Sequence, residues 1–178
     1  MTAPGAGGAA DGGDGIAWGP TSVSVVRVLA APRQRLFDLV AEPAAHPRID
    51  GSGTLRGVLR GPARLGPGAR FGMGMRMGLP HRVTNRVVEF DEGRRIAWAH
   101  LSGNVWRWEF ADAPDGGADR DGDADGDASA GGTEVRETFE WGRSRAPWAM
   151  RRFAARNAAV MARSIERLGA LATGRDAG

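Results

Sequence analysis

The chain has 178 residues, of which 42% are hydrophobic and 25% charged, a composition typical of one soluble globular domain. It contains no Cys, which excludes disulfides, thiolate metal sites and cysteine nucleophiles, and we expect a reducing, cytoplasmic location. The net charge is +3, yet the isoelectric point is about 11.0, because every basic residue is Arg and neither Lys nor Tyr is present to lose a proton at alkaline pH.

The N-terminal part of the domain is predicted to be a strand followed by two short helices. Residues 1–20 are rich in Gly and Ala, and we expect a disordered tail there. Thr21–Ala30 is rich in β-branched residues, which favours a strand. Pro32 suits the first turn of a helix that continues to Ala41, and the prolines of the following AAHPRID segment limit the second helix to a short piece.

Six further segments are predicted to be strands, because apolar and polar residues alternate along them. They are Thr54–Arg60, Ala69–Gly78, His81–Asp91, Arg94–Leu101, Val105–Ala111 and Thr133–Gly142. The alternation puts Met73, Met75 and Met77 on one face of their strand. Trp98 lies on a different strand from Trp106 and Trp108, and the pattern does not fix the register, so we expect that not every Trp faces inward.

The segment Asp112–Gly132 is predicted to be a mobile acidic loop between two strands. It has no apolar residue larger than Ala or Pro, so it cannot bury enough surface to offset the entropy of ordering. Asp121, Asp123 and Asp125 match the start of a calcium-binding EF loop, but the twelfth position is Gly132, where a bidentate Glu is required. Calcium binding at this loop therefore stays open.

Pro147–Ala172 is predicted to be one long amphipathic helix, with Ser144 as its N-cap and residues 173–178 as a C-terminal tail. At about 1.5 Å per residue this helix is nearly 40 Å long, the width of a small domain. The elements together predict an α+β fold, in which a curved antiparallel sheet of six or seven strands is covered by this helix. Such a sheet does not close tightly around one helix and tends to leave an apolar cavity.

Several short motifs, in this order, resemble those of the SRPBCC superfamily, the START-like or helix-grip group. They are Ala30-Ala31-Pro32 followed by Arg35-Leu36-Phe37-Asp38-Leu39-Val40, then Val88-Glu89-Phe90-Asp91 with Arg95-Ile96-Ala97-Trp98, and Gly132-Thr133-x-Val135-x-x-Thr138 before the long helix. The resemblance covers residues 21–172 and implies a single START-like domain with a helix-grip fold. It also implies a cavity for apolar or aromatic molecules but no particular reaction, since members include polyketide cyclase/dehydrase-like enzymes, lipid carriers and regulatory binders.

The candidate ligand-binding residues are the Met, Trp and Phe side chains of the sheet together with residues of the long helix; each could instead be plain core. They are Met73, Met75, Met77, Trp98, His100, Trp106, Trp108, Phe139, Trp141, Phe153, Asn157 and Met161. His100 is the candidate catalytic residue, because a His in an apolar cavity titrates near neutral pH; Glu109 or Glu137 could pair with it. His46 and His81 stand beside prolines and are interpreted as turn residues.

No sequence motif indicates a cofactor or a metal. Gly51-x-Gly53 and Gly72-x-Gly74 do not complete a dinucleotide fingerprint, and neither GxSxG nor HExxH occurs. No apolar run approaches the roughly 20 residues of a membrane span, and the N-terminus lacks the features of a secretory signal. We expect no cofactor, no metal, no membrane insertion and, because the Arg residues are scattered, no nucleic-acid partner.

Three functional hypotheses follow from the sequence. The first is the binding of a hydrophobic or aromatic small molecule, lipid- or polyketide-like, between the sheet and the last helix. The second is a polyketide cyclase/dehydrase-like enzyme that uses the same cavity. The third is an interaction module whose basic last helix docks a protein or RNA. The ligand and the oligomeric state are left open by the sequence.

Overall fold

The computed structural model describes residues 10–12, 14–114 and 132–175. The central acidic loop, with its EF-like aspartates, and the ends of both tails lie outside the described residues. Within them a single antiparallel sheet holds nine strands in the order β1-β2-β3-β9-β8-β7-β6-β5-β4. The first long strand and the last one, β3 and β9, are therefore neighbours inside the sheet.

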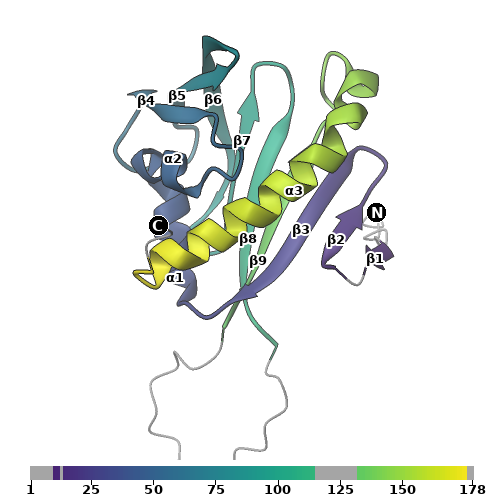
Figure 1. Ribbon diagram of the computed structural model, residues 1–178. Helices are drawn as coiled ribbons and strands as arrows, with labels where there is room; N and C mark the ends of the chain where they lie inside the picture. Colours follow the sequence, from purple (N-terminus) through teal and green to yellow (C-terminus); the bar gives the residue numbers. More distant parts are fainter. Residues whose placement is uncertain (1–9, 13, 115–131, 176–178) are drawn as a thin grey trace, which may run out of the picture.

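The strands are β1 (Ala10–Gly12), β2 (Ile16–Trp18), β3 (Ser22–Leu29), β4 (Leu55–Arg60), β5 (Arg70–Met77), β6 (Leu79–Asp91), β7 (Arg95–His100), β8 (Val105–Asp112) and β9 (Thr133–Glu140). The helices are α1 (Arg33–Ala41), α2 (His46–Ile49) and α3 (Pro147–Ala172), with a 3₁₀ turn at Pro43–Ala45 between the first two. The long helix α3 crosses the concave face of the sheet, and α1 and α2 lie beside its C-terminal half (Figure 1). The chain thus has the expected α+β, helix-grip architecture.

The seven predicted strands are β3 to β9, and two more precede them. Residues 10–12 and 16–18 form a hairpin on the edge of β3, in a region where the sequence predicts a disordered tail. Ile16 and Trp18 pair with Val25 and Val23 of β3, so even this three-residue strand is held by the sheet edge. A strand this short has too few residues to show a period of two.

The start of α3 also differs from the prediction. The N-cap is Ala146 rather than Ser144, and it makes no side-chain hydrogen bond. The Ser144 hydroxyl instead accepts a bond from the amide of Ala146, at 3.3 Å, in the turn before the helix. Pro147 at the first helical position supplies the start of the helix, because its fixed φ suits that position.

The closed part of the core lies under the C-terminal half of α3. Phe37 of α1 is fully buried and makes edge-to-face contacts with Phe90 and Phe110, at ring-centroid distances of 5.7 and 5.9 Å. Ile165 and Leu168 of α3 are fully buried on the same side of the sheet.

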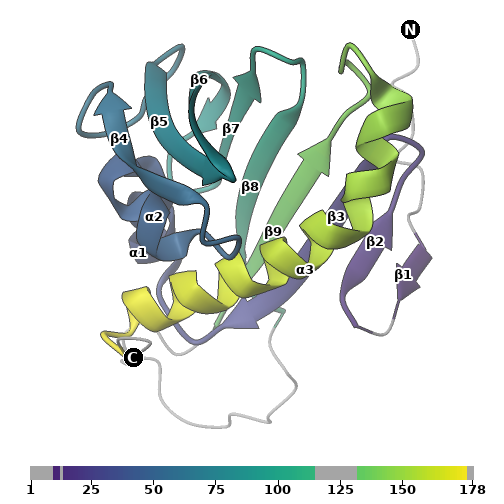
Figure 2. The same cartoon turned by 45° about the horizontal axis from the view of Figure 1, so that its top comes forward.

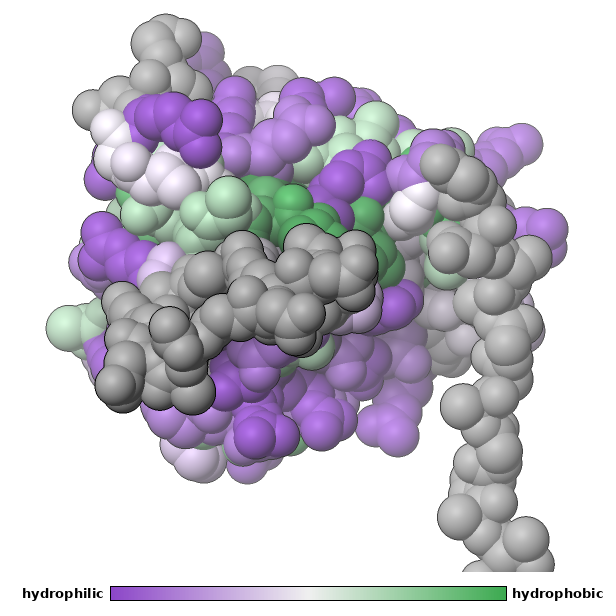
Figure 3. Space-filling model, turned by 90° about the horizontal axis from the view of Figure 1, so that it is seen from below, coloured by the Kyte–Doolittle hydropathy of each residue, from purple (hydrophilic) through white to green (hydrophobic). Residues whose placement is uncertain are grey.

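Seen from below, where β8 ends and β9 begins, polar side chains surround a band of hydrophobic residues on the surface (Figure 3). No described helix is long and apolar enough to cross a membrane.

Candidate functional site

A cavity of about 600 Å³ lies between the concave face of the sheet and the N-terminal part of α3. Its walls are strands β5 to β9, the loop between α2 and β4, and the segment of α3 from Met150 to Ser164. In Figure 2 the strands β4 to β7 curl toward α3 from one side, and β8, β9 and β3 pass beneath it. The sheet curvature therefore produces the cavity that the sequence predicts.

An aromatic wall forms the sheet side of the cavity. Trp98 of β7 pairs with Trp106 of β8, and Trp106 pairs with Phe139 of β9. The Trp106 and Phe139 ring centroids are 4.6 Å apart. Because Trp108 lies two residues after Trp106, it faces the same side. All three Trp residues therefore line the cavity, whereas the sequence led us to expect that at least one would not.

Most of the expected binding residues line this cavity. They are Met73, Met75, Trp98, His100, Trp106, Trp108, Phe139, Phe153 and Asn157. Trp141 and Met161 are buried but belong to the packed core; the Trp141 ring lies 5.6 Å from that of Phe139. The Met77 side chain lies outside the described residues.

His100 lies at the end of β7, where the sequence places it on the same face as Trp98. Its Nδ1 is 2.8 Å from the hydroxyl of Ser102 in the following turn. Burial, and to a lesser extent the charge of His81, lowers the pKa of His100. The imidazole is therefore held neutral more readily than a free His, which suits a proton acceptor.

His46 was interpreted as a turn residue, but it is a buried part of the cavity wall. Its ring stacks on Trp98 at 5.3 Å and meets Phe71 edge-on at 5.7 Å. Its Nε2 lies 2.8 Å from the carbonyl oxygen of Val40 and donates to it, because a carbonyl only accepts. Burial lowers the pKa of His46, so the neutral ring is favoured. The sequence carries no signal for this position, since it results from how α2 packs on the sheet.

Glu137 is the most unusual polar residue of the cavity. It lies on β9 directly between Val25 of β3 and Trp108 of β8, and its side chain is only 4% exposed. Its Oε2 is buried and has no hydrogen-bond partner among the described residues. Burial, with a smaller effect from the negative charge of Asp50, raises the pKa of Glu137 well above its usual value. A neutral carboxylic acid is therefore favoured at this position.

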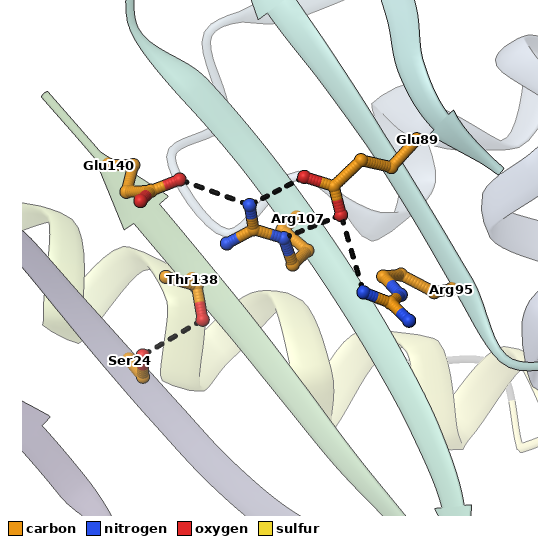
Figure 4. A network of polar contacts seen from close by, with 6 residues as sticks. All are labelled: Ser24, Glu89, Arg95, Arg107, Thr138 and Glu140. Atoms are coloured by element: carbon orange, nitrogen blue, oxygen red, sulfur yellow. Dashed lines mark hydrogen bonds and ion pairs between the residues drawn. The ribbon is translucent and has the colours of Figure 1, made fainter. Parts of the chain in front are cut away.

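Glu109, the other acid considered as a partner of His100, lies on the opposite face of the sheet. It pairs with Arg95 and Arg136 and alternates with the inward-facing Trp108. On that convex face Arg107 donates to Glu89 through two nitrogens, at 3.0 and 2.6 Å, and to Glu140 at 3.1 Å (Figure 4). The charges of Arg107, Glu89 and Glu140 are therefore paired with one another on the convex face, away from the cavity.

The loop between α2 and β4 lines the cavity and is hydrogen-bonded to α3. The amide of Gly51 donates to the Ser164 hydroxyl at 3.0 Å, and Arg163 donates to the Gly51 carbonyl at 2.9 Å. Arg167 donates to the carbonyl of Asp50. Ser164, which could have contacted a ligand oxygen, is thus committed to this loop. Arg163 and Arg167 are also bonded to this loop, although the hypothesis that the basic last helix docks a protein or RNA requires the Arg residues of that helix.

The opening of the cavity is marked by its exposed lining residues. His81 and Arg82 belong to the start of β6, and Phe153 and Arg156 to the first turns of α3. Asn104, in the turn before β8, lies inside this rim. Its amide nitrogen is 3.4 Å from the Met150 sulfur, and its buried Oδ1 has no hydrogen-bond partner in the part of the chain that the structure describes. The described residues include no cluster of three or more His, Asp or Glu that could hold a metal ion.

Comparison with known proteins supports the fold. No family model matches the chain. Rv0088 of Mycobacterium tuberculosis, described as uncharacterized, is 44% identical over 93 residues, which are 52% of this chain and 42% of that protein. The chain thus matches less than half the length of this relative.

Solved structures match most of the chain. Protein NE0264 from Nitrosomonas europaea superposes with a TM-score of 0.62 at 14% identity, covering 89% of this chain and 97% of its own. Ms6760 from Mycobacterium smegmatis gives 0.60 at 16%, covering 86% and 92%. The AHSA1-like protein from Aeromonas hydrophila gives 0.57 at 17%, covering 88% and 96%. The chain therefore shares its α+β, helix-grip architecture with these solved structures. Identities this low establish a shared architecture and leave the activity to the site itself.

Proposed function

We propose that the chain binds a hydrophobic or aromatic small molecule in the cavity between the sheet and α3. The observation that carries this proposal is a cavity of about 600 Å³ walled by Trp98, Trp106, Trp108 and Phe139. This volume is within the range of pockets that hold cofactors and drug-sized ligands, roughly 300–1,000 Å³. The broad aromatic faces and the adaptable Met side chains supply apolar contact area without fixing one ligand shape.

The test is native mass spectrometry of the purified protein, followed by thermal-shift measurements with fatty acids, sterols and polycyclic aromatic compounds. Asn157→Trp should fill the cavity and abolish any bound mass and any ligand-induced shift. Ala155→Trp is the matched control, because Ala155 is exposed on α3 and the same bulk would point into solvent. Binding that survives in the Asn157→Trp protein would contradict the proposal.

A second function, a polyketide cyclase/dehydrase-like enzyme, is favoured by His46, His100 and Glu137, which line the same cavity. In that case a bound ligand should change in mass during incubation. His100→Ala should stop the change without abolishing ligand binding, because the aromatic wall remains. Glu109→Ala on the opposite face of the sheet is the control, and equal turnover in all three proteins would remove His100 from the mechanism.

A further inference from the structure

Glu137, the one acid that is buried among the described residues, lies on the apolar wall and gives information about the ligand of the cavity. Glu137 is flanked across the sheet by Val25 and Trp108, and along β9 by Val135 and Phe139. A buried polar group without a partner costs roughly 1–3 kcal/mol of stability, so its retention in a packed wall calls for a role.

No described cation lies within ion-pair distance of Glu137, in contrast to Glu89 on the other face of the sheet. The charge that affects the pKa of Glu137 is that of Asp50, which has the same sign. The Asp50 carboxylate is bonded elsewhere, because it accepts from the amides of Thr54 and Leu55 and from the hydroxyl of Ser52. Glu137 is therefore surrounded by groups that favour the neutral acid, which can donate a hydrogen bond.

Two residues that line the cavity each have a buried side-chain oxygen without a hydrogen-bond partner among the described residues, Glu137 Oε2 and Asn104 Oδ1. The oxygen of an amide can only accept, so of the two only the Glu137 carboxylic acid can serve an acceptor on a guest. The positively charged rim, with Arg82 and Arg156, disfavours the entry of a cationic guest that would pair with a carboxylate.

We propose that the guest of the cavity is an apolar molecule with a carbonyl oxygen, and that this oxygen accepts a hydrogen bond from the carboxylic acid of Glu137. The inference rests on the proposed binding function and specifies its ligand class, uncharged ketones and related carbonyl compounds. The aromatic wall holds the hydrocarbon body, and Glu137 fixes which end of the molecule lies deepest.

The experiment compares acetylphenanthrene, a ketone, with ethylphenanthrene, a hydrocarbon of nearly the same shape, by isothermal titration. The protein should bind the ketone about tenfold or more tightly, the value of one hydrogen bond of about 1.4 kcal/mol. Glu137→Leu should abolish this preference while keeping hydrocarbon binding. Glu137→Gln should retain most of it, because the amide still donates. Glu109→Leu, on the opposite face, is the control and should leave the preference unchanged.

The infrared stretching frequency of the bound ketone gives a readout that does not depend on affinity. It should be lowered in the unaltered protein and in Glu137→Gln, and should rise in Glu137→Leu to its value in an apolar solvent. Equal affinity for ketone and hydrocarbon, both blocked by Asn157→Trp, would overturn this inference and leave the binding function standing. Tighter binding of the matched amine, aminoethylphenanthrene, would also overturn it. If neither compound binds the unaltered protein, the binding function falls and this inference with it.

Discussion

The C-terminal half of α3 lies on a closed core, whereas its N-terminal part lies over the cavity. Met161, Ile165 and Leu168 are fully buried and pack near α1. Toward the other end Trp148 is 77% exposed and Phe153 50% exposed, and Asn157 is half-buried. One continuous helix therefore closes the core at one end and covers the cavity at the other. Its 26 residues are long enough to do both.

The largest expected effect concerns the closed end. Leu168→Ala should lower the free energy of unfolding by about 2–5 kcal/mol, because it removes buried apolar contacts and leaves a cavity in a packed core. Phe153→Ala at the open end is the control. It should change stability by less than about 1 kcal/mol, since half of that side chain is already in water. Urea unfolding of both proteins measures the difference, and equal losses would contradict the division of α3.

An intermediate effect is expected at the junction between the two ends, where Gly51 meets α3. A Cβ on Gly51 would lie 2.2 Å from the Val160 carbonyl oxygen and 2.8 Å from the Cβ of Arg163. Gly51→Ala should therefore force the loop away from the helix and cost about 1–3 kcal/mol in the same unfolding assay. Gly66→Ala is the matched control, because no atom lies within 4 Å of a Cβ there. A neutral Gly51→Ala would show that the loop is not held against α3.

The smallest effect has the opposite sign. Glu137→Gln should raise the stability of the ligand-free protein at neutral pH by about 1 kcal/mol, or roughly 2–4 °C in Tm, because Gln spares the chain the cost of protonating an ionised Glu on folding. Glu89→Gln on the convex face should instead lower stability, since Arg107 holds the pKa of Glu89 below its usual value.

The pH dependence separates these two carboxyl groups. Folded Glu137 holds its proton more tightly than the unfolded chain, so its contribution is greatest at acidic pH and is lost as the pH rises through its raised pKa. The gain from Glu137→Gln should therefore grow between about pH 5 and pH 8. The contribution of Glu89 should instead be lost as the pH falls through its lowered pKa. Parallel pH profiles of Tm for the two variants would contradict this assignment.

Periodicity was sufficient to predict the elements that have enough residues to show it. The strands β3 to β9 lie where the alternation predicts them, and α3 covers the predicted Pro147–Ala172. The hairpin of β1 and β2 could not be predicted, because its strands are three residues long and depend on the free edge of β3.

The site was less predictable than the fold, because it depends on register. A shift of one residue between β7 and β8 would turn Trp106 and Trp108 outward, and nothing in a single sequence excludes that shift. The same uncertainty left Glu109 and Glu137 as equal partners for His100, although only Glu137 faces the cavity. His46 reaches the wall through the packing of a four-residue helix, which no local pattern specifies.

The meeting of β8 and β9 has a practical consequence for engineering. The amide of Ala113 donates to the carbonyl of Gly132 at 2.8 Å, so the two strand ends are already joined at hairpin distance. This junction lies at the opposite end of the molecule from the turn between β5 and β6 and from the start of α3 (Figure 1). A short turn could close this connection, and a fluorescent reporter could equally be inserted into it. Either change would leave the entrance untouched, which makes this junction a convenient attachment point for a biosensor.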